Sequence, residues 1–253
     1  MYADIDGIRV HYEIAGEGVP VLLLHGWGCS TKTMEPLANF LASGYRAVSI
    51  DFPGHGETDE PREPWSVTEY AHLTKKLIEH LGIAPCHVIA HSFGCRVAIF
   101  MASEWPELFG KLLLTGAAGL IPRRTLRYYA KVYAYKLGKR LAKVSFLDRL
   151  FRISERQKNA GSADYRALSD NMKGTFVRVV NQNLLDRLKR IRSETLLVWG
   201  SEDTETPLSF GKTMEREIPD SALVIFEGAG HYAFLEQFPR FCAVCKYFLE
   251  GAS

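Results

Sequence analysis

The sequence predicts an α/β protein with a mostly parallel sheet and helices on both of its faces. Short apolar runs alternate along the chain with longer stretches of helical spacing, and glycine, proline and polar residues separate them. Continuous apolar runs are typical of strands buried on both faces, and the alternation favours right-handed parallel crossovers. The 253 residues are enough for a large core, and 47% hydrophobic with 24% charged residues is an ordinary globular composition.

The N-terminal half supplies the first elements. Residues 2–14 alternate in polarity around Asp6-Gly7, which predicts an opening antiparallel hairpin. Residues 19–24, 46–50 and 86–90 are predicted strands, with helices over residues 33–43 and 95–103. A further helix over residues 66–81 begins with the capping box Ser66-Val67-Thr68-Glu69 and ends at Gly82.

The second half repeats the alternation around one long interruption. Residues 111–115, 195–200 and 222–226 are predicted strands, and residues 211–218 and 240–249 are predicted helices. Residues 120–192, called the basic insert below, have helix-like amphipathic stretches and no strand candidate. They hold 19 of the chain's 31 Lys and Arg but only 5 of its 29 Asp and Glu, so the insert is basic and the rest of the chain is acidic.

A serine lies where the predicted strand 86–90 breaks into the next helix. Ser92 has the small residue Ala90 two positions before it and Gly94 two positions after it. This is close to the G-x-S-x-G pattern of a nucleophile on a tight strand-to-helix turn, with Ala90 in place of the first glycine. The alternative is a serine that only caps a buried helix.

Two later residues give that serine partners. Asp203 and His231 follow the predicted strands 195–200 and 222–226, so all three side chains fall at the carboxyl ends of strands. A serine hydroxyl needs a neighbouring base, and an imidazole held by a carboxylate provides one. The alternatives are a structural capping role for Asp203, with Glu202 or Glu205 as the acid, and a turn role for His231.

With these residues in place, the chain resembles the α/β-hydrolase superfamily, in its serine-nucleophile branch with a helical lid. The resemblance runs from about residue 5 to residue 250 through five stretches, His25-Gly26-Trp27, residues 51–56, residues 91–94, residues 199–203 and residues 228–231. It implies the α/β-hydrolase fold and a triad of Ser92, Asp203 and His231. It also implies an oxyanion hole formed by the backbone N–H groups of Trp27 and Phe93. Cys95 stands where many relatives have a second glycine.

The resemblance also divides the chain into domains. It implies a hydrolase core of residues 1–119 and 193–253, with residues 120–192 as a helical lid (cap) over the site. Within the lid, residues 125–144 place an apolar stripe on one helical face, formed by Leu126, Tyr129, Tyr133, Leu137 and Leu141. The basic residues of the insert fit a solvated face, the steering of an anionic substrate by Arg123, Arg124 or Arg127, or contact with an anionic membrane surface.

The expected chemistry is hydrolysis of a small or medium carboxylic ester or thioester through an acyl-enzyme. Arg96 resembles the Gly-Gly-Arg ending of the same turn in the menaquinone-pathway synthase, so a triad-dependent lyase is an alternative, as is a C–C bond hydrolase like those of meta-cleavage products. A non-catalytic ligand-binding protein on this fold is a third. His25 and Arg96 are candidate substrate contacts, although His25, like His55 and His91, also fits a structural loop histidine.

No cofactor or metal site is expected, because Cys242 and Cys245 have the C-x-x-C spacing but no second Cys or His pair lies at zinc-site spacing. The expected partner is a small-molecule substrate, and nucleic acid is disfavoured because the sequence shows no binding module. The five cysteines are odd in number and scattered, which fits free thiols in a cytoplasmic protein. The oligomeric state stays open.

Overall fold

The computed structural model describes residues 1–121, 133 and 168–251 of the chain. Its strands are β1 (Tyr2–Ile5), β2 (Ile8–Ala15), β3 (Val19–Leu24), β4 (Tyr45–Ile50), β5 (Cys86–His91), β6 (Phe109–Thr115), β7 (Thr195–Gly200) and β8 (Ser221–Phe226). Its helices are α1 (Thr31–Leu41), α2 (Val67–Leu81), α3 (Phe93–Glu104), the 3₁₀ turn Pro106–Leu108, α8 (Asp170–Asn181), α9 (Leu185–Leu188), α10 (Leu208–Glu217), α11 (Ala233–Glu236) and α12 (Phe238–Glu250).

The eight strands form one sheet in the order β1-β2-β4-β3-β5-β6-β7-β8. β1 pairs with β2 and β2 with β4 in antiparallel fashion, and every other pairing is parallel. The predicted opening hairpin and the mostly parallel sheet are therefore confirmed. The chain order reverses at β3, which lies between β4 and β5, and ligands bind at the carboxyl ends of strands beside such a switch point.

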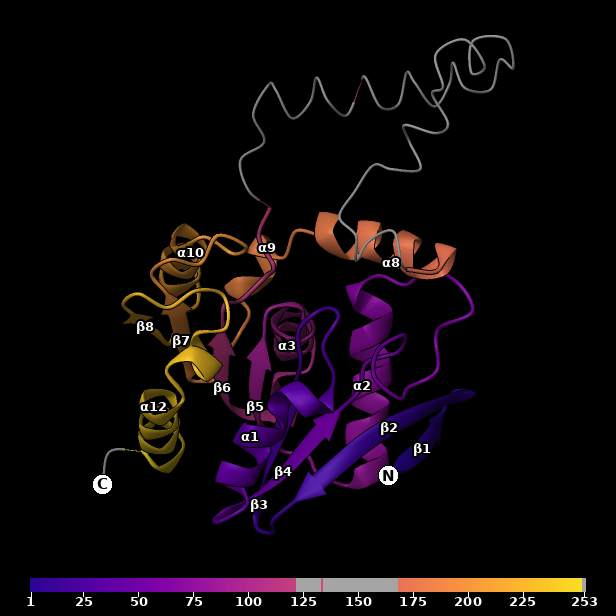
Figure 1. Cartoon of the computed structure of the whole chain (residues 1–253), viewed down its shortest axis with the longest axis horizontal. Coiled ribbons are helices and arrows are strands. Elements are labelled where there is room, and N and C mark those ends of the chain that lie inside the picture. The colour runs from indigo at the N-terminus through magenta and orange to yellow at the C-terminus, as the bar shows by residue number, and fades with distance from the viewer. Residues whose placement is uncertain (122–132, 134–167, 252–253) are drawn as a thin grey trace.

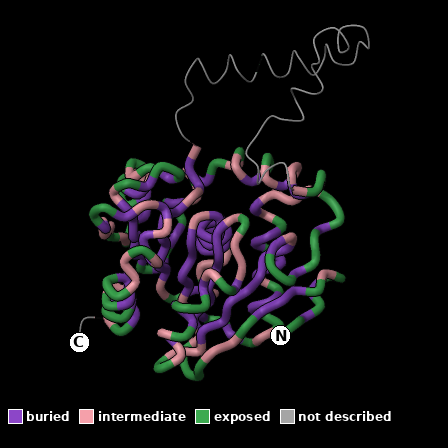
Figure 2. The backbone as a smooth tube through the Cα atoms, in the orientation of Figure 1, coloured by how far each residue is buried: buried purple, intermediate pink, exposed green. Residues whose placement is uncertain are grey.

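The central strands are buried along most of their length (Figure 2). Successive residues of such a strand point to opposite faces of the sheet, which divides the core into two layers. Leu22 and Leu24 of β3 belong to the cluster formed with α2 and α3, whereas Val21 and Leu23 belong to the cluster formed with α1 and α12. Burial on both faces explains why the central strands are continuous apolar runs. The sheet is thus packed on both faces, and the loops after β5, β7 and β8 extend from its carboxyl edge.

Local signals set the helix boundaries. Ser66 caps α2 in the predicted capping box with Glu69, and Gly82 closes the helix in the left-handed conformation at φ 60°. Helix α1 begins at Thr31, two residues before the predicted start. The backbone N–H of Thr31 donates to the Asp51 carboxylate (2.6 Å), so a residue from the next loop satisfies a first-turn amide.

Helices α8 and α9 are the described helices of the basic insert apart from the helical residue Tyr133, and the described residues of the insert contain no strand. Helix α8 lies across the end of the molecule at which α2 begins (Figure 1). Its C-cap residue Gln182 accepts from the Val67 N–H (2.9 Å). The remainder of the predicted helix over residues 125–144 lies outside the described residues. Tyr133, a residue of the predicted apolar stripe, is 68% exposed.

No helix in the described parts of the chain combines the length and the apolar character needed to cross a bilayer.

Candidate active site

Ser92 lies on a strained turn between β5 and α3. Its backbone has φ 50° and ψ −108°, in the region that residues with a side chain seldom adopt. The turn is held by the Ser92 N–H, which donates to the Thr115 carbonyl (3.1 Å), and by the Ala118 N–H, which donates to the Ser92 carbonyl (3.2 Å). The neighbouring strand β6 therefore enforces a conformation that the isolated turn would not keep.

Gly94 explains why the turn needs a glycine two residues after the serine. A Cβ atom at this position would lie 2.4 Å from the Leu24 carbonyl oxygen and 2.8 Å from that of His25. The first turn of α3 thus packs directly on the backbone that leaves β3. Cys95 occupies the next position without difficulty, and its thiol donates to the Ala90 carbonyl (3.1 Å).

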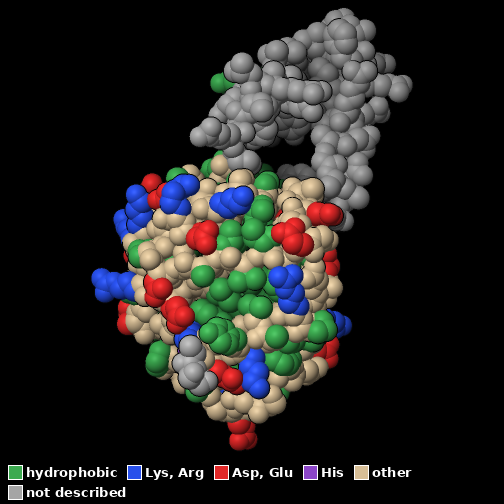
Figure 3. Space-filling model, turned by 90° about the vertical axis from the view of Figure 1, so that its left-hand side faces the viewer, with side chains coloured by type: hydrophobic (Ala, Val, Ile, Leu, Met, Phe, Trp, Pro, Cys, Tyr) green, Lys and Arg blue, Asp and Glu red, His purple; other side chains and the backbone are tan. Residues whose placement is uncertain are grey.

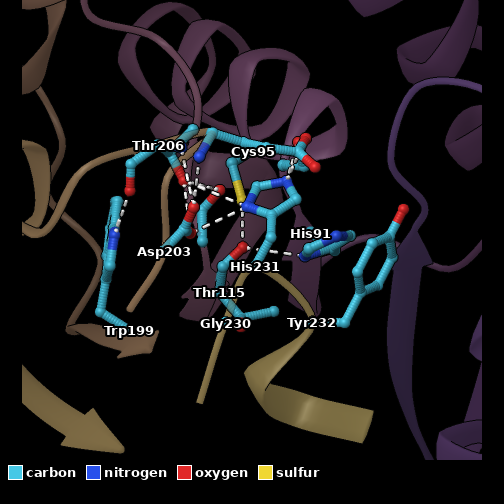
Figure 4. A network of polar contacts seen from close by, with 12 residues as sticks. His91, Cys95, Thr115, Trp199, Asp203, Thr206, Gly230, His231 and Tyr232 are labelled. Carbon is cyan, nitrogen blue, oxygen red and sulfur yellow. Dashed lines mark hydrogen bonds and ion pairs between the residues drawn. The ribbon is translucent and has the colours of Figure 1, made fainter. Parts of the chain in front are cut away.

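The three residues singled out by order along the chain meet in one hydrogen-bonded chain. His231 Nε2 lies 2.9 Å from Ser92 Oγ, and His231 Nδ1 lies 2.8 Å from Asp203 Oδ2. Figure 4 shows His231 with Asp203, Thr206 and Trp199 on one side and His91 and Tyr232 on the other. The imidazole therefore has the position of a base for the serine, with a carboxylate behind it.

Asp203 is held in its ionised form. Burial raises the pKa of this carboxyl, but the hydrogen bonds from His231 and Thr206 outweigh burial, and the pKa lies below its ordinary value. Asp203 Oδ1 accepts from the N–H groups of Glu205 and Thr206, both at 2.9 Å. An ionised carboxylate only accepts, so the proton between it and the imidazole sits on Nδ1, and Nε2 is free to accept from Ser92.

Thr206 is a part of this network that the sequence reasoning missed. Its hydroxyl lies 2.8 Å from Asp203 Oδ2 and 3.0 Å from the Gly116 carbonyl, and its own carbonyl accepts from the Trp199 indole (2.7 Å). The signal was present in the spacing, because an Asp that binds the amides two and three residues later forms a local turn. Thr206 is the fourth residue of that turn, three positions after Asp203.

Gly116 lies against the same network at φ 52°. A Cβ atom there would lie 3.2 Å from His231 Nδ1 and 3.3 Å from Asp203 Oδ2. The end of β6 thus comes close to the imidazole and its carboxylate because it carries no side chain.

His91 supports the imidazole from the other side. Its ring centroid is 4.8 Å from that of His231, and its Nδ1 donates to the Thr115 carbonyl (3.2 Å). Burial, followed by the neighbouring His231, lowers the pKa of His91 to about 3, so this ring is neutral at physiological pH. Within the described part of the chain, its Nε2 is buried without a hydrogen-bond partner.

Trp27 and Phe93, the two residues predicted to form the oxyanion hole, line the same cavity as Ser92. Phe93 is the first residue of α3, and the first amides of a helix have no partner inside it. Trp27 follows β3 in the turn closed by the Cys29 N–H to the Gly26 carbonyl (3.2 Å), and its ring packs against that of Phe93 at 5.3 Å. Their role as oxyanion donors stays a proposal.

A cavity of about 320 Å³ opens beside Ser92. Its walls are mainly apolar and come from the core and the basic insert together, including Trp27, Phe93, Leu120, Phe176, Val179 and Phe210. The polar side chains on it are those of Ser92, Arg96, Glu205 and Thr206. Phe176, Val179, Glu205 and Phe210 were not predicted from the sequence, because no local pattern reveals which side chains meet across a cavity.

Arg96 forms a buried wall of this cavity. Its side chain is 6% exposed, and its Nη1 donates to the Gln182 carbonyl (2.8 Å). Burial lowers the pKa of the guanidinium to about 10, which leaves it protonated at neutral pH. Within the described residues no carboxylate lies at ion-pair distance from Arg96, so it faces the cavity as a cation.

His25 does not reach the cavity. It is fully buried, its Nδ1 lies 2.7 Å from the Gly26 carbonyl, and its Nε2 accepts from the Phe52 N–H (3.0 Å). Both ring nitrogens are occupied, so we correct its predicted contact with substrate to a structural role in the loop after β3. The other predicted contacts, Arg123, Arg124 and Arg127, lie outside the described residues.

A larger hollow of about 640 Å³ lies between β8 and α12, on a face where hydrophobic side chains gather (Figure 3). Ser92, Asp203 and His231 do not line this hollow, so we do not assign the active site to it despite its larger volume. Among the described residues no group of three or more His, Cys, Asp or Glu is arranged to hold a metal ion.

Comparison with known proteins places this geometry in context. A family model described as the alpha/beta hydrolase family matches residues 21–244. A curated relative, 2-hydroxy-6-oxo-6-phenylhexa-2,4-dienoate hydrolase from Comamonas testosteroni, is 28% identical over 98% of this chain and 93% of its own length.

Two solved structures share the fold. The esterase EaEST from Exiguobacterium antarcticum superposes with a TM-score of 0.77 at 22% identity, covering 99% of both chains. The meta-cleavage product hydrolase from Pseudomonas fluorescens superposes with a TM-score of 0.75 at 23% identity, covering 99% of this chain and 97% of its own.

Proposed function

The chain belongs to the alpha/beta hydrolase family, and from that premise we propose that it is a serine hydrolase that cleaves a small or medium carboxylic ester or thioester. The observation that carries the proposal is the hydrogen-bonded chain from Ser92 through His231 to Asp203. An ester or thioester needs a nucleophile, a base that becomes an acid, and donors for the oxyanion. The site offers a group for each of these tasks.

In the first half of the proposed reaction, Ser92 Oγ attacks the acyl carbon while His231 Nε2 takes the hydroxyl proton. The ionised Asp203 holds the imidazole in the tautomer that can accept this proton and stabilises the imidazolium that results. The N–H groups of Trp27 and Phe93 receive the developing oxyanion, each donor contributing about 3 kcal/mol to transition-state stabilisation.

In the second half, His231 Nε2–H gives its proton to the leaving oxygen or sulfur, which departs and leaves an acyl group on Ser92. Water then enters, loses a proton to the same Nε2 and attacks the acyl carbon. The acid is released and Ser92 regains its proton. The cavity of about 320 Å³ with aromatic walls fits a small or medium acyl group.

The substitution Ser92→Ala tests this proposal directly. We expect the rate of hydrolysis of a chromogenic short-chain ester to fall by at least about 10³-fold while the protein stays folded. Release of the coloured alcohol measures this rate. Ser209→Ala makes the same change at an exposed serine of α10 and should keep full activity. Full activity in Ser92→Ala would overturn the proposal.

A second candidate is hydrolysis of a C–C bond, for which two observations speak. A curated relative at 28% identity acts on a dienoate, according to its name, and the buried cation of Arg96 faces the cavity with no carboxylate partner among the described residues. A dienoate carries a carboxylate that Arg96 could bind. Incubation with 2-hydroxy-6-oxo-6-phenylhexa-2,4-dienoate and release of benzoate would favour this candidate over ester hydrolysis.

The other sequence-based alternatives stay predictions and have their own tests. Pyruvate release from the menaquinone-pathway intermediate would indicate the lyase. A folded protein whose Ser92 resists serine-directed probes would indicate a ligand-binding protein. We also propose residues 120–192 as the lid, because Phe176, Val179 and Val180 of α8 line the cavity. The cytoplasmic location and contact of the insert with a membrane stay predictions.

A further inference from the structure

We infer that Glu205 makes this site select its leaving group by charge, favouring a cationic leaving group over a neutral one and disfavouring an anionic one. The inference rests on the proposed hydrolysis and adds a substrate class to it. Glu205 follows the triad acid by two residues and lines the cavity together with Ser92.

The first step is the position of the carboxylate. Glu205 Oε2 lies 3.5 Å from His231 Nε2, the same nitrogen that lies 2.9 Å from Ser92 Oγ. In the proposed reaction this nitrogen gives its proton to the leaving atom, which must therefore come within hydrogen-bond distance of Nε2. Every leaving group thus passes within a few ångströms of the Glu205 carboxylate.

The second step is that the position of Glu205 is tied to the triad. Its backbone N–H donates to Asp203 Oδ1 (2.9 Å), and the next residue, Thr206, donates both its N–H and its hydroxyl to the same carboxylate. The group that orients the imidazole therefore also fixes the backbone from which the Glu205 side chain extends. The two carboxylates differ in their hydrogen bonding, since Asp203 accepts from several donors of the network and Glu205 faces His231 Nε2.

The third step is the charge that remains. Within the described part of the chain, no Lys or Arg lies at ion-pair distance from Glu205, and its one ionic neighbour is His231. The Glu205 side chain is 68% exposed, so its charge faces the open side of the site. Arg96, the cation of the same cavity, is buried and bonded to the Gln182 carbonyl. The leaving-group side is therefore negative and the Arg96 wall positive.

The exposure of Glu205 sets the expected size of the effect. Ion pairs open to solvent contribute little, which corresponds to a preference of about threefold to fivefold between a cationic leaving group and its neutral isostere. Such a preference should shrink at high salt, because ions screen exposed charges. A discrimination of this size leaves the neutral ester as a good substrate, which makes it an internal reference.

The test compares three butyrate esters with leaving groups of different charge: choline, its neutral isostere 3,3-dimethylbutanol, and the anion 3-hydroxypropanoate. We expect the wild type to show kcat/KM about threefold to fivefold higher for the choline ester than for the neutral ester, and lowest for the anionic ester. In Glu205→Gln the three values should converge. Glu202→Gln removes the same charge from an exposed position in the same loop and should keep the wild-type ranking.

The outcomes are distinguishable. Ser92-dependent hydrolysis of the neutral ester, with the same charge ranking in the wild type and in Glu205→Gln, would overturn the inference and leave the proposed function standing. Equal loss of the preference in Glu202→Gln would also overturn it, because the effect would then come from net charge alone. A wild type that hydrolyses none of the three would overturn the proposed function and this inference with it.

Discussion

The triad and the cavity beside it are built differently. Ser92, His231 and Asp203 come from three loops at the carboxyl edge of one sheet, and hydrogen bonds join them to one another and to the neighbouring loops. The cavity is shared between that core and α8 of the basic insert, and packing rather than hydrogen bonding shapes most of it. We therefore propose that the core supplies the chemistry, and that α8 and the opposite charges of Arg96 and Glu205 supply the selection of the substrate.

Asp203→Asn should have the largest effect, because Asp203 orients the imidazole that serves as the base of the triad. The amide cannot hold the imidazole in the reactive tautomer, and the corresponding change in other triads lowers kcat by about 10⁴-fold. Steady-state kinetics on a chromogenic ester measures the loss, and circular dichroism checks the fold. A decrease of less than tenfold would mean that another acid, such as Glu202, serves His231.

Arg96→Met should act on the cavity and spare the triad. A charged hydrogen bond is worth about 1.5–3 kcal/mol, so KM for a substrate with a carboxylate on its acyl part should rise by about 10- to 100-fold. The value for a neutral acyl ester of equal length should change much less. Equal losses for both substrates would show that Arg96 only joins α3 to the end of α8.

The neutral His91 predicts how stability depends on pH. Its pKa is about 3 in the folded protein and about 6.5 when unfolded, so acid favours the unfolded chain. The stability involved is fully present above pH 6.5 and is lost as the pH falls towards 3, by up to about 1.4 kcal/mol per pH unit. When the free energy of unfolding is measured by urea titration at several pH values between 7 and 4.5, it should depend less steeply on pH for His91→Asn than for the wild type. An equal pH dependence in the two proteins would contradict this expectation.

Thr206→Val should have the smallest effect on the triad. It removes one hydrogen bond to the ionised Asp203, which keeps its bonds from the N–H groups of Glu205 and Thr206. We expect a loss of about 1.5 kcal/mol, the low end for a bond to a charged group, so kcat should fall by about tenfold with little change in KM. Thr206→Ser keeps the hydroxyl and should recover most of the activity. If Ser and Val variants lose activity equally, the methyl group rather than the hydroxyl matters.

The triad and the cavity also differ in how far the sequence predicts them. The strands 19–24 and 195–200 have the predicted bounds. A strand that is buried on both faces has a continuous apolar run of residues, and such a run is visible in the sequence. The meeting of Ser92, Asp203 and His231 was predictable for a similar reason, since the carboxyl ends of parallel strands share one edge of the sheet. These features depend on local pattern and chain order.

Cavity features depend on distances across the fold, and they were missed or misassigned. His25 is a predicted substrate contact, but its ring is buried and its Nε2 accepts from the Phe52 N–H. Glu205 was weighed only as a substitute for Asp203, although its carboxylate faces the other nitrogen of His231. No spacing along the chain encodes these orientations.

Labelling by a fluorophosphonate, followed by peptide mass spectrometry, tests directly whether Ser92 is the nucleophile. We expect the folded wild type to be labelled at Ser92, ester hydrolysis to fall in proportion to the label, and His231→Ala to be labelled far more slowly. Full activity in protein completely labelled at Ser92, or labelling that does not depend on His231, would contradict the assignment of Ser92 as the nucleophile.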